Sequence, residues 1–383
     1  MQRTPQSQPS GGFRMVHRAL SLALAGALVL AMAASAFAQV AVTTPFNTAG
    51  VSANGRVDIL VGFTESQVVP PVESGTFQPL VRAIDMTAAP MGTALVPYVQ
   101  DLDSYFATRF GWRPSKPVTV LLYSNSANLQ NGLQSLSGGS ISANQQSLAM
   151  SEPAALIMVT EGQSGIVPPN SWAILVNTDI DAAAQQFASL AGQVNTIDAS
   201  LVPGVLSGGT SSPVINPNSF DTGILSQDQI FNNGMAMIQE SLARQYANVM
   251  MNDLGGSNVP TWFRQGMADS LAFTIVPGIP LETGLAVAVA RSQSNTGALP
   301  TLSQLNSGGF PALLSTGGTA GAIGEGVSFL STQSLLNSVS GAQIVDLLKG
   351  LGAGQSLDAQ LQSSTGFSLT SLNNQYQSLI PIP

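Results

Sequence analysis

The chain has 383 residues and carries few charges: 8% of its residues are charged, with 12 basic and 20 acidic side chains and a formal net charge of −8. It has no cysteine and a single histidine, His17, which excludes disulfide bonds and argues against zinc-dependent or histidine-assisted chemistry. An acidic chain without basic runs is not expected to bind nucleic acid or anionic lipid by charge.

The first 38 residues have the pattern of a secretory signal peptide. Arg3, Arg14 and Arg18 make a basic leader before an apolar run that starts at Ala19. The run ends in Ala36-Phe37-Ala38, the small-x-small pattern that signal peptidase cleaves. The sequence therefore predicts a secreted or extracytoplasmic protein (cell surface or periplasm), with an uncleaved anchor as the alternative. Cleavage removes His17 and leaves 345 of the 383 residues, with no later apolar stretch long enough to span a membrane. The form of the signal and the absence of Asn-x-Ser/Thr sequences point to a bacterial protein.

Residues 39–54 are polar and predict a linker, and residues 55–200 predict an N-terminal α/β subdomain. Apolar residues recur at helical spacing from Leu95 to Phe110, and Gly111 ends this helix. A loop is expected at Asn131–Asn144, which is rich in serine and glycine. Four short apolar runs predict strands: Val57–Phe63, Val118–Tyr123, Ala155–Thr160 and Trp172–Asn177.

Residues 201–227 predict an exposed connecting loop, and residues 228–383 predict a helical C-terminal subdomain. Asp228 is the expected N-cap of a helix of about 25 residues that closes near Gly255-Gly256, and Pro260 begins the next helix. The glycine-rich stretch Gly317–Gly326 is expected to be a flexible linker. The remaining helices are expected at Glu325–Asn337, Ala342–Leu351, Leu357–Ser363 and Leu369–Leu379.

Two of these helices carry a resemblance to a known family. The segment MIQESLARQYANVMMNDLGGSNVPTWFRQGMADSLAF resembles the core of the gluzincin (peptidase MA-like) metallopeptidases, in which H-E-x-x-H lies on one helix and P-x-W-x-x-E-G-x-A on the next. Segments before and after this one also resemble the family. The resemblance covers about residues 55–380, except Leu201–Thr222. The resemblance implies an α+β, zincin-like fold, with a mixed sheet and packed helix followed by a helical half.

In this family two histidines and a glutamate hold zinc, and the glutamate of H-E-x-x-H activates the metal-bound water. Matched residue by residue, Gln239 and Ala243 stand at the two histidine positions, Glu240 at the catalytic glutamate and Gln265 at the third ligand. The resemblance thus implies a degenerate site with no zinc, no other metal and no cofactor. Gln239 and Gln265 are expected to hydrogen-bond across it.

Other catalytic patterns have weaker support. Asp221 lies in an aspartic-peptidase-like D-T-G, but the chain has no second D-T-G or D-S-G to share its proton, so a turn is expected there. A serine–lysine pair could use only Lys116, in a turn, or Lys349, near a helix end. The 20 acidic residues leave open a hydrolase that uses carboxylates alone.

The predicted function is a secreted, non-catalytic pseudo-metallopeptidase with a binding or structural role. Its expected partner is a peptide or protein at the old substrate cleft, added to a sheet edge formed by Trp172–Asn177. The alternatives are an envelope-associated structural protein without a cleft function and the carboxylate-only hydrolase.

Overall fold

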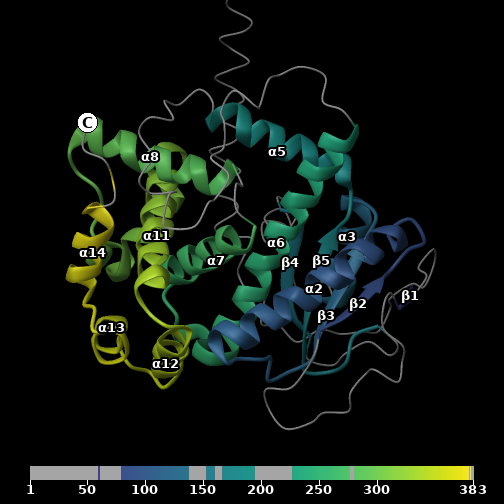
Figure 1. Ribbon diagram of the computed structural model, residues 1–383, viewed down its shortest axis with the longest axis horizontal. Coiled ribbons are helices and arrows are strands. Elements are labelled where there is room, and N and C mark those ends of the chain that lie inside the picture. Colours follow the sequence, from purple (N-terminus) through teal and green to yellow (C-terminus); the bar gives the residue numbers. More distant parts are fainter. Residues whose placement is uncertain are drawn as a thin grey trace, which may run out of the picture.

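Figure 1 shows the protein as a computed structural model with a sheet on one side and a group of helices on the other. The structure describes residues 59–60, 79–137, 152–159, 166–194, 227–276, 280–378 and 380. The predicted signal peptide and linker, Asp221 and nearly all of the predicted connecting loop lie outside these residues. Within the described part, no helix is both long and apolar enough to cross a lipid bilayer.

The sheet is mixed, and its strands lie in the order β1-β2-β3-β5-β4. Strands β2, β3 and β5 run parallel, whereas β1 and β4 at the two ends pair antiparallel with their neighbours. The α+β class expected from the sequence is therefore confirmed. The strands span Ile59–Leu60 (β1), Leu80–Ala83 (β2), Val118–Tyr123 (β3), Ala154–Val159 (β4) and Ser171–Asn177 (β5).

The position of β5 corrects one prediction. Trp172–Asn177 was expected to form a free sheet edge, but β5 lies between β3 and β4 and is hydrogen-bonded to both. Its continuous run of buried apolar residues is what an internal strand requires, because both of its faces are covered. The strand at this end of the sheet is β4 instead.

Three helices lie in the described part of the chain's N-terminal half, and the first two pack on the sheet. Helix α2 (Ala89–Phe110) ends at Gly111, whose φ of 62° is the left-handed conformation that glycine adopts readily. Helix α3 (Ser126–Leu136) starts at Asn125, whose side chain accepts the N–H of Asn128. The predicted loop at Asn131–Asn144 is therefore wrong for residues 131–136, which are helical because their leucines pack on the sheet. Helix α5 (Ile180–Val194) was not predicted.

Helix α6 (Gln227–Gly255) lies at the centre of the molecule, between the sheet and the C-terminal helices (Figure 1). Asp228 lies inside α6, so it is not the N-cap. The other elements are η4 (Gly256–Asn258), α7 (Thr261–Ile275), α8 (Pro280–Thr296), α9 (Leu302–Gln304), η5 (Leu305–Gly309), α10 (Phe310–Thr316), α11 (Gly318–Ser338), α12 (Gly341–Gly352), α13 (Leu357–Thr365) and α14 (Leu369–Ser378).

The glycine-rich stretch is not a linker. Residues from Gly318 onward form the first turns of α11, and the glycines allow neighbouring backbone to approach closely. A Cβ on Gly326, for example, would lie 2.5 Å from the carbonyl oxygen of Leu285 in α8. Tertiary packing therefore overrides the low helix propensity of this segment.

One apolar core unites the two predicted subdomains. Val120 of β3, Phe106 of α2, Tyr246 of α6 and Leu330 of α11 belong to the same cluster of buried side chains. A second, smaller cluster fills the space between α3 and the opposite face of the sheet. Because the main cluster crosses the boundary at residues 201–227, the described residues of both halves are packed around a common interior.

The contact between α7 and α11 predicts a sharp difference between two glycine substitutions. A methyl group on Gly266 would lie 2.2 Å from the carbonyl oxygen of Ser328, so Gly266→Ala must push the two helices apart. We expect it to lower the free energy of unfolding by about 1–3 kcal/mol. Gly324→Ala is the matched control, because the three atoms nearest to its methyl group belong to the side chains of Leu313 and Phe310 and lie 3.2 Å or more away. Urea denaturation measures both, and equal effects would contradict the close helix contact.

Candidate functional site

The candidate site is a polar face of α6 that is buried inside the molecule. Glu240, Ser241, Arg244, Gln245 and Asn248 are each at most 1% exposed. Positions three and four apart lie on one side of a helix, so these five side chains form a continuous stripe. Buried polar groups need partners, and the partners define the site.

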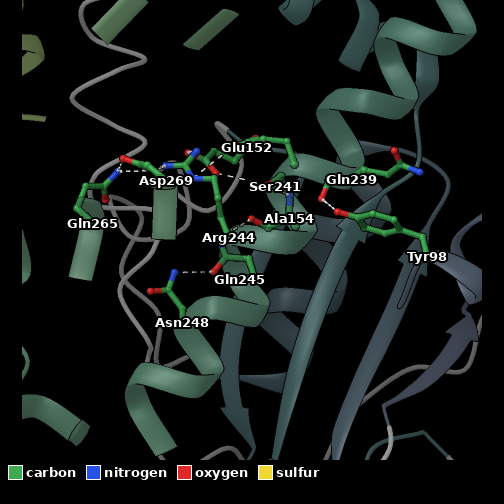
Figure 2. Close-up of polar contacts among 11 residues, drawn as sticks. Tyr98, Glu152, Ala154, Gln239, Ser241, Arg244, Gln245, Asn248, Gln265 and Asp269 are labelled. Carbon is green, nitrogen blue, oxygen red and sulfur yellow. Dashed lines mark hydrogen bonds and ion pairs between the residues drawn. The ribbon is translucent and has the colours of Figure 1, made fainter. Parts of the chain in front are cut away.

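Arg244 is at the centre of the stripe. Its Nη1 lies 3.0 Å from Oε1 of Glu152, which precedes β4, and its Nη2 lies 2.9 Å from Oδ1 of Asp269 in α7 (Figure 2). Its Nε lies 3.4 Å from Oε1 of Glu240, one helical turn earlier. Arg244 therefore connects α6 to α7 and to the segment before β4 through charge-assisted contacts.

The rest of the stripe attaches α6 to the start of β4. The hydroxyl of Ser241 accepts the N–H of Ala154 at 3.0 Å and lies 3.5 Å from Oε2 of Glu152. The amide of Gln245 donates to the carbonyl oxygen of Ala154 at 3.3 Å and accepts from Asn248 at 3.4 Å. Side chains of α6 thus hydrogen-bond the backbone of the first residue of β4 (Figure 2).

The structure brings together only part of the predicted site. Glu240 belongs to the Arg244 network, and Gln265 donates its amide to the two carboxylate oxygens of Asp269 at 3.0 and 3.3 Å. Ala243 is fully buried in the apolar core. Gln239 accepts the hydroxyl of Tyr98 with its backbone carbonyl at 2.8 Å, and its side chain extends away from Gln265 (Figure 2). Arg244 joins α6 and α7, in place of the expected pairing of Gln239 with Gln265.

Two further acids lie within the electrostatic reach of this network, and sequence reasoning missed both. Glu282 in the first turn of α8 is 0% exposed and Glu325 in α11 is 1% exposed. Arg244 and Asp269 influence both carboxyl groups. Arg244 and Glu152 were missed as well. Only the four-residue spacing of Glu240 and Arg244 on one helix could have revealed part of the network from the sequence.

Burial dominates the electrostatics of these acids, because removal from water disfavours the charged form. It raises the pKa of Glu240 to about 7, against the opposing effect of Arg244. It also raises the pKa of Glu152, and it holds the pKa values of Glu282 and Glu325 well above the usual range. Burial alone would lower the pKa of Arg244, but Asp269, Glu152 and the other acids keep it well above its ordinary value.

The donor set does not suit a divalent metal ion. Glu152, Glu240 and Asp269 direct their oxygens at a guanidinium group, which already carries the positive charge between them. Across the described residues, no group of three or more aspartate, glutamate, histidine or cysteine side chains has the arrangement of a metal site. The Arg244 network can hold segments of the fold together, and its acids can bind protons.

The lysines of the serine–lysine alternative lie elsewhere. Lys116 is placed over the ring of Trp172, with its Nζ 5.8 Å from the ring centre, and Lys349 lies in the last turn of α12. A cation in the last turn of a helix interacts favourably with the helix dipole, as expected from the sequence.

No protein-family model, curated protein or solved structure matches this chain.

Proposed function

We propose that this chain is an exported, non-catalytic relative of the gluzincin (peptidase MA-like) metallopeptidases, and that an arginine-centred ion network with a structural role has replaced the metal site. One observation carries the proposal. The guanidinium of Arg244, 1% exposed, is bound by Glu152 and Asp269 between the two helices that carry the resemblance. In this reading Arg244 supplies the positive charge that a zinc ion supplies in an active relative.

The geometry favours a match that is shifted by one residue. Glu240 and Arg244 lie one helical turn apart on a common face, as the two histidines of H-E-x-x-H do, and Ser241 between them takes the place of the glutamate. Gln265 of α7 adjoins the same network through Asp269. The frame E-S-L-A-R therefore accounts for the contacts better than the frame that starts at Gln239.

A structural role fits the burial of the network. Its charged side chains, from Glu152 to Asp269, are at most 6% exposed, so a substrate cannot reach them in this conformation. This argues against a carboxylate-only hydrolase that would use the acids of the network. The strand expected to receive a peptide, Trp172–Asn177, is hydrogen-bonded on both sides and offers no free edge. The peptide-binding role therefore loses the feature on which it was based.

Two sets of substitutions test the proposed match. The shifted frame is restored by Glu240→His, Ser241→Glu, Arg244→His and Gln265→Glu, and the original frame by Gln239→His, Ala243→His and Gln265→Glu. We expect the first set to bind one zinc ion per chain, because its two imidazoles face the space that Arg244 now fills. We expect the second set to bind none at the site, because position 239 faces Tyr98's side of the helix. Metal analysis after dialysis and zinc-dependent thermal stabilisation measure the difference.

The wild-type protein provides the control. We expect purified wild-type protein to contain no stoichiometric zinc and to leave general peptide substrates uncleaved. Stoichiometric zinc or clear cleavage would refute the non-catalytic assignment. Zinc binding by neither variant set, with both sets folded by circular dichroism, would remove the support for the family relationship.

A further inference from the structure

The carboxyl group of Glu282 is buried beside another acid. Glu282 is 0% exposed, and it lies within hydrogen-bonding reach of the carboxyl group of Glu240. Apart from that neighbour, no group of the described residues hydrogen-bonds either of its carboxyl oxygens. Likewise, no donor of the described residues hydrogen-bonds Oε1 of Glu240. Its contact with Nε of Arg244 is an ion pair of 3.4 Å.

The surroundings contain more acids than bases. Arg244 on α6, Asp269 on α7 and Glu152 before β4 act on the Glu240–Glu282 pair, and Tyr98 on α2 interacts with Glu240. Glu325 on α11 interacts with Arg244, Asp269 and Glu152. If every acid were ionised, the single guanidinium would face five carboxylates, all of them at most 6% exposed. Buried charges without a counter-charge are strongly unfavourable, so part of the cluster must be neutral.

A proton is the ligand that resolves this imbalance. Two adjacent carboxylates repel each other, whereas a carboxylic acid and a carboxylate form a strong hydrogen bond. One proton on the Glu240–Glu282 pair removes one buried negative charge and gives an unpartnered oxygen of each residue a hydrogen-bond partner. The unpartnered carboxyl oxygens of Glu282, beside another acid, therefore point to a bound proton.

We propose that Glu282 retains a proton at neutral pH and donates it in a hydrogen bond to the carboxylate of Glu240, so that a bound proton fastens the first turn of α8 to α6. Glu240 is the acceptor because it lies next to Arg244, which stabilises its negative charge. Glu282 has Glu240 and Asp269 as neighbours, which disfavour its ionised form, and burial holds its pKa well above the usual range. This inference does not depend on the family relationship, because it rests on the burial of Glu282 and on the groups around it.

The bound proton makes the docking of α8 sensitive to alkaline pH. Apart from Glu282, α8 packs mainly against α11 and α5. Loss of the proton turns an attractive contact between α8 and α6 into a repulsion between two buried carboxylates. The protein thus has a proton-binding site whose release loosens one helix at its N-terminal end.

Infrared spectroscopy tests the proton directly. At pH 8 exposed carboxyl groups are ionised, so a carboxylic acid C=O stretching band reports only acids with a strongly raised pKa. We expect the wild-type protein to show this band at pH 8 from Glu282 and Glu325, and Glu282→Gln to reduce it by about half. Because Glu325→Gln leaves Glu282 unchanged, this variant must keep the part of the band that comes from Glu282. This variant tests the proposal even if Glu282→Gln does not fold.

Hydrogen exchange tests the effect on α8. Between pH 7 and pH 10 we expect the protection factors of α8 in the wild-type protein to fall about tenfold relative to those of α12, and to change by less than about threefold in Glu282→Gln. Asp346→Asn, an exposed acid on α12, should behave as the wild type does. The absence of an acid band from Glu325→Gln at pH 8, or equal pH dependence of α8 in the wild type and Glu282→Gln, would overturn the proposal.

Discussion

Replacing Arg244 with methionine should lower the free energy of unfolding at pH 7 by about 3–5 kcal/mol. Methionine fills a similar volume but leaves Glu152 and Asp269 without their cation in a buried site. Removing one partner of a buried ion pair is costly because an uncompensated charge remains. Urea denaturation at pH 7 measures the loss. The loss should be smaller at pH 5, where acids with raised pKa values take up protons more readily.

The rest of the network supplies the compensating variant. Adding Glu152→Gln and Asp269→Asn to Arg244→Met removes the charges of the two acids closest to the guanidinium, and we expect at least half of the lost stability to return. Arg109→Met is the matched control: Arg109 is exposed and donates to the carbonyl oxygen of Leu336, so its loss should cost about 1 kcal/mol or less. If the triple variant were no more stable than Arg244→Met, the destabilisation would come from lost packing, and the ion network would not have the structural role proposed for it.

The stability of the wild-type protein should decline as the pH rises from 5 to 8. The pKa of Glu240 is about 7 in the folded protein against 4.5 for an ordinary glutamate, so the folded state binds more protons than the unfolded state across this interval. Its contribution is complete below pH 4.5 and is lost as the pH rises through 7, which amounts to about 3 kcal/mol. Glu152, Glu282 and Glu325 act in the same direction, because burial raises their pKa values too.

Glu240→Gln isolates this effect. The variant should show a shallower decline between pH 5 and pH 7, by up to about 1.4 kcal/mol per pH unit, in urea denaturation at several pH values. Asp346→Asn, which removes an exposed acid, should follow the wild-type curve. A free energy of unfolding that rises from pH 5 to pH 8 would show that the buried acids are stabilised in their ionised forms, contrary to this account.

Local patterns in the sequence were sufficient for most individual elements. The apolar run Val118–Tyr123 is β3, and Gly111 ends α2 in the left-handed conformation. Pro260, expected to begin the next helix, is the N-cap residue directly before α7. These features depend on neighbouring residues, which is why they could be predicted. Helix α8 and the start of α11 were missed because their weak or glycine-rich patterns become helical through contacts with other elements. Helix α5 was missed although its alanine-rich sequence favours a helix.

The site was only partly predictable for the same reason. Glu240 and Gln265 were recognised through the resemblance, and both adjoin the buried network. Arg244 lies four residues from Glu240, but its other partners, Glu152 and Asp269, are distant in the chain. Nothing local shows which face of α6 meets them, since nearly every side chain of its second half is buried.

The sequence by itself determined which chemical groups are available. Its only imidazole is His17 in the predicted signal peptide, it has no thiol, and its acidic residues, 20 in number, exceed its basic ones. It also determined the α+β class, through the apolar runs and the helical periodicity. Only the tertiary structure decided that five of those acids, all buried, interact with one guanidinium, and that Trp172–Asn177 is an internal strand. The physical reason is that charge compensation and strand order depend on which distant segments pack together, and the spacing of residues along the chain does not encode this.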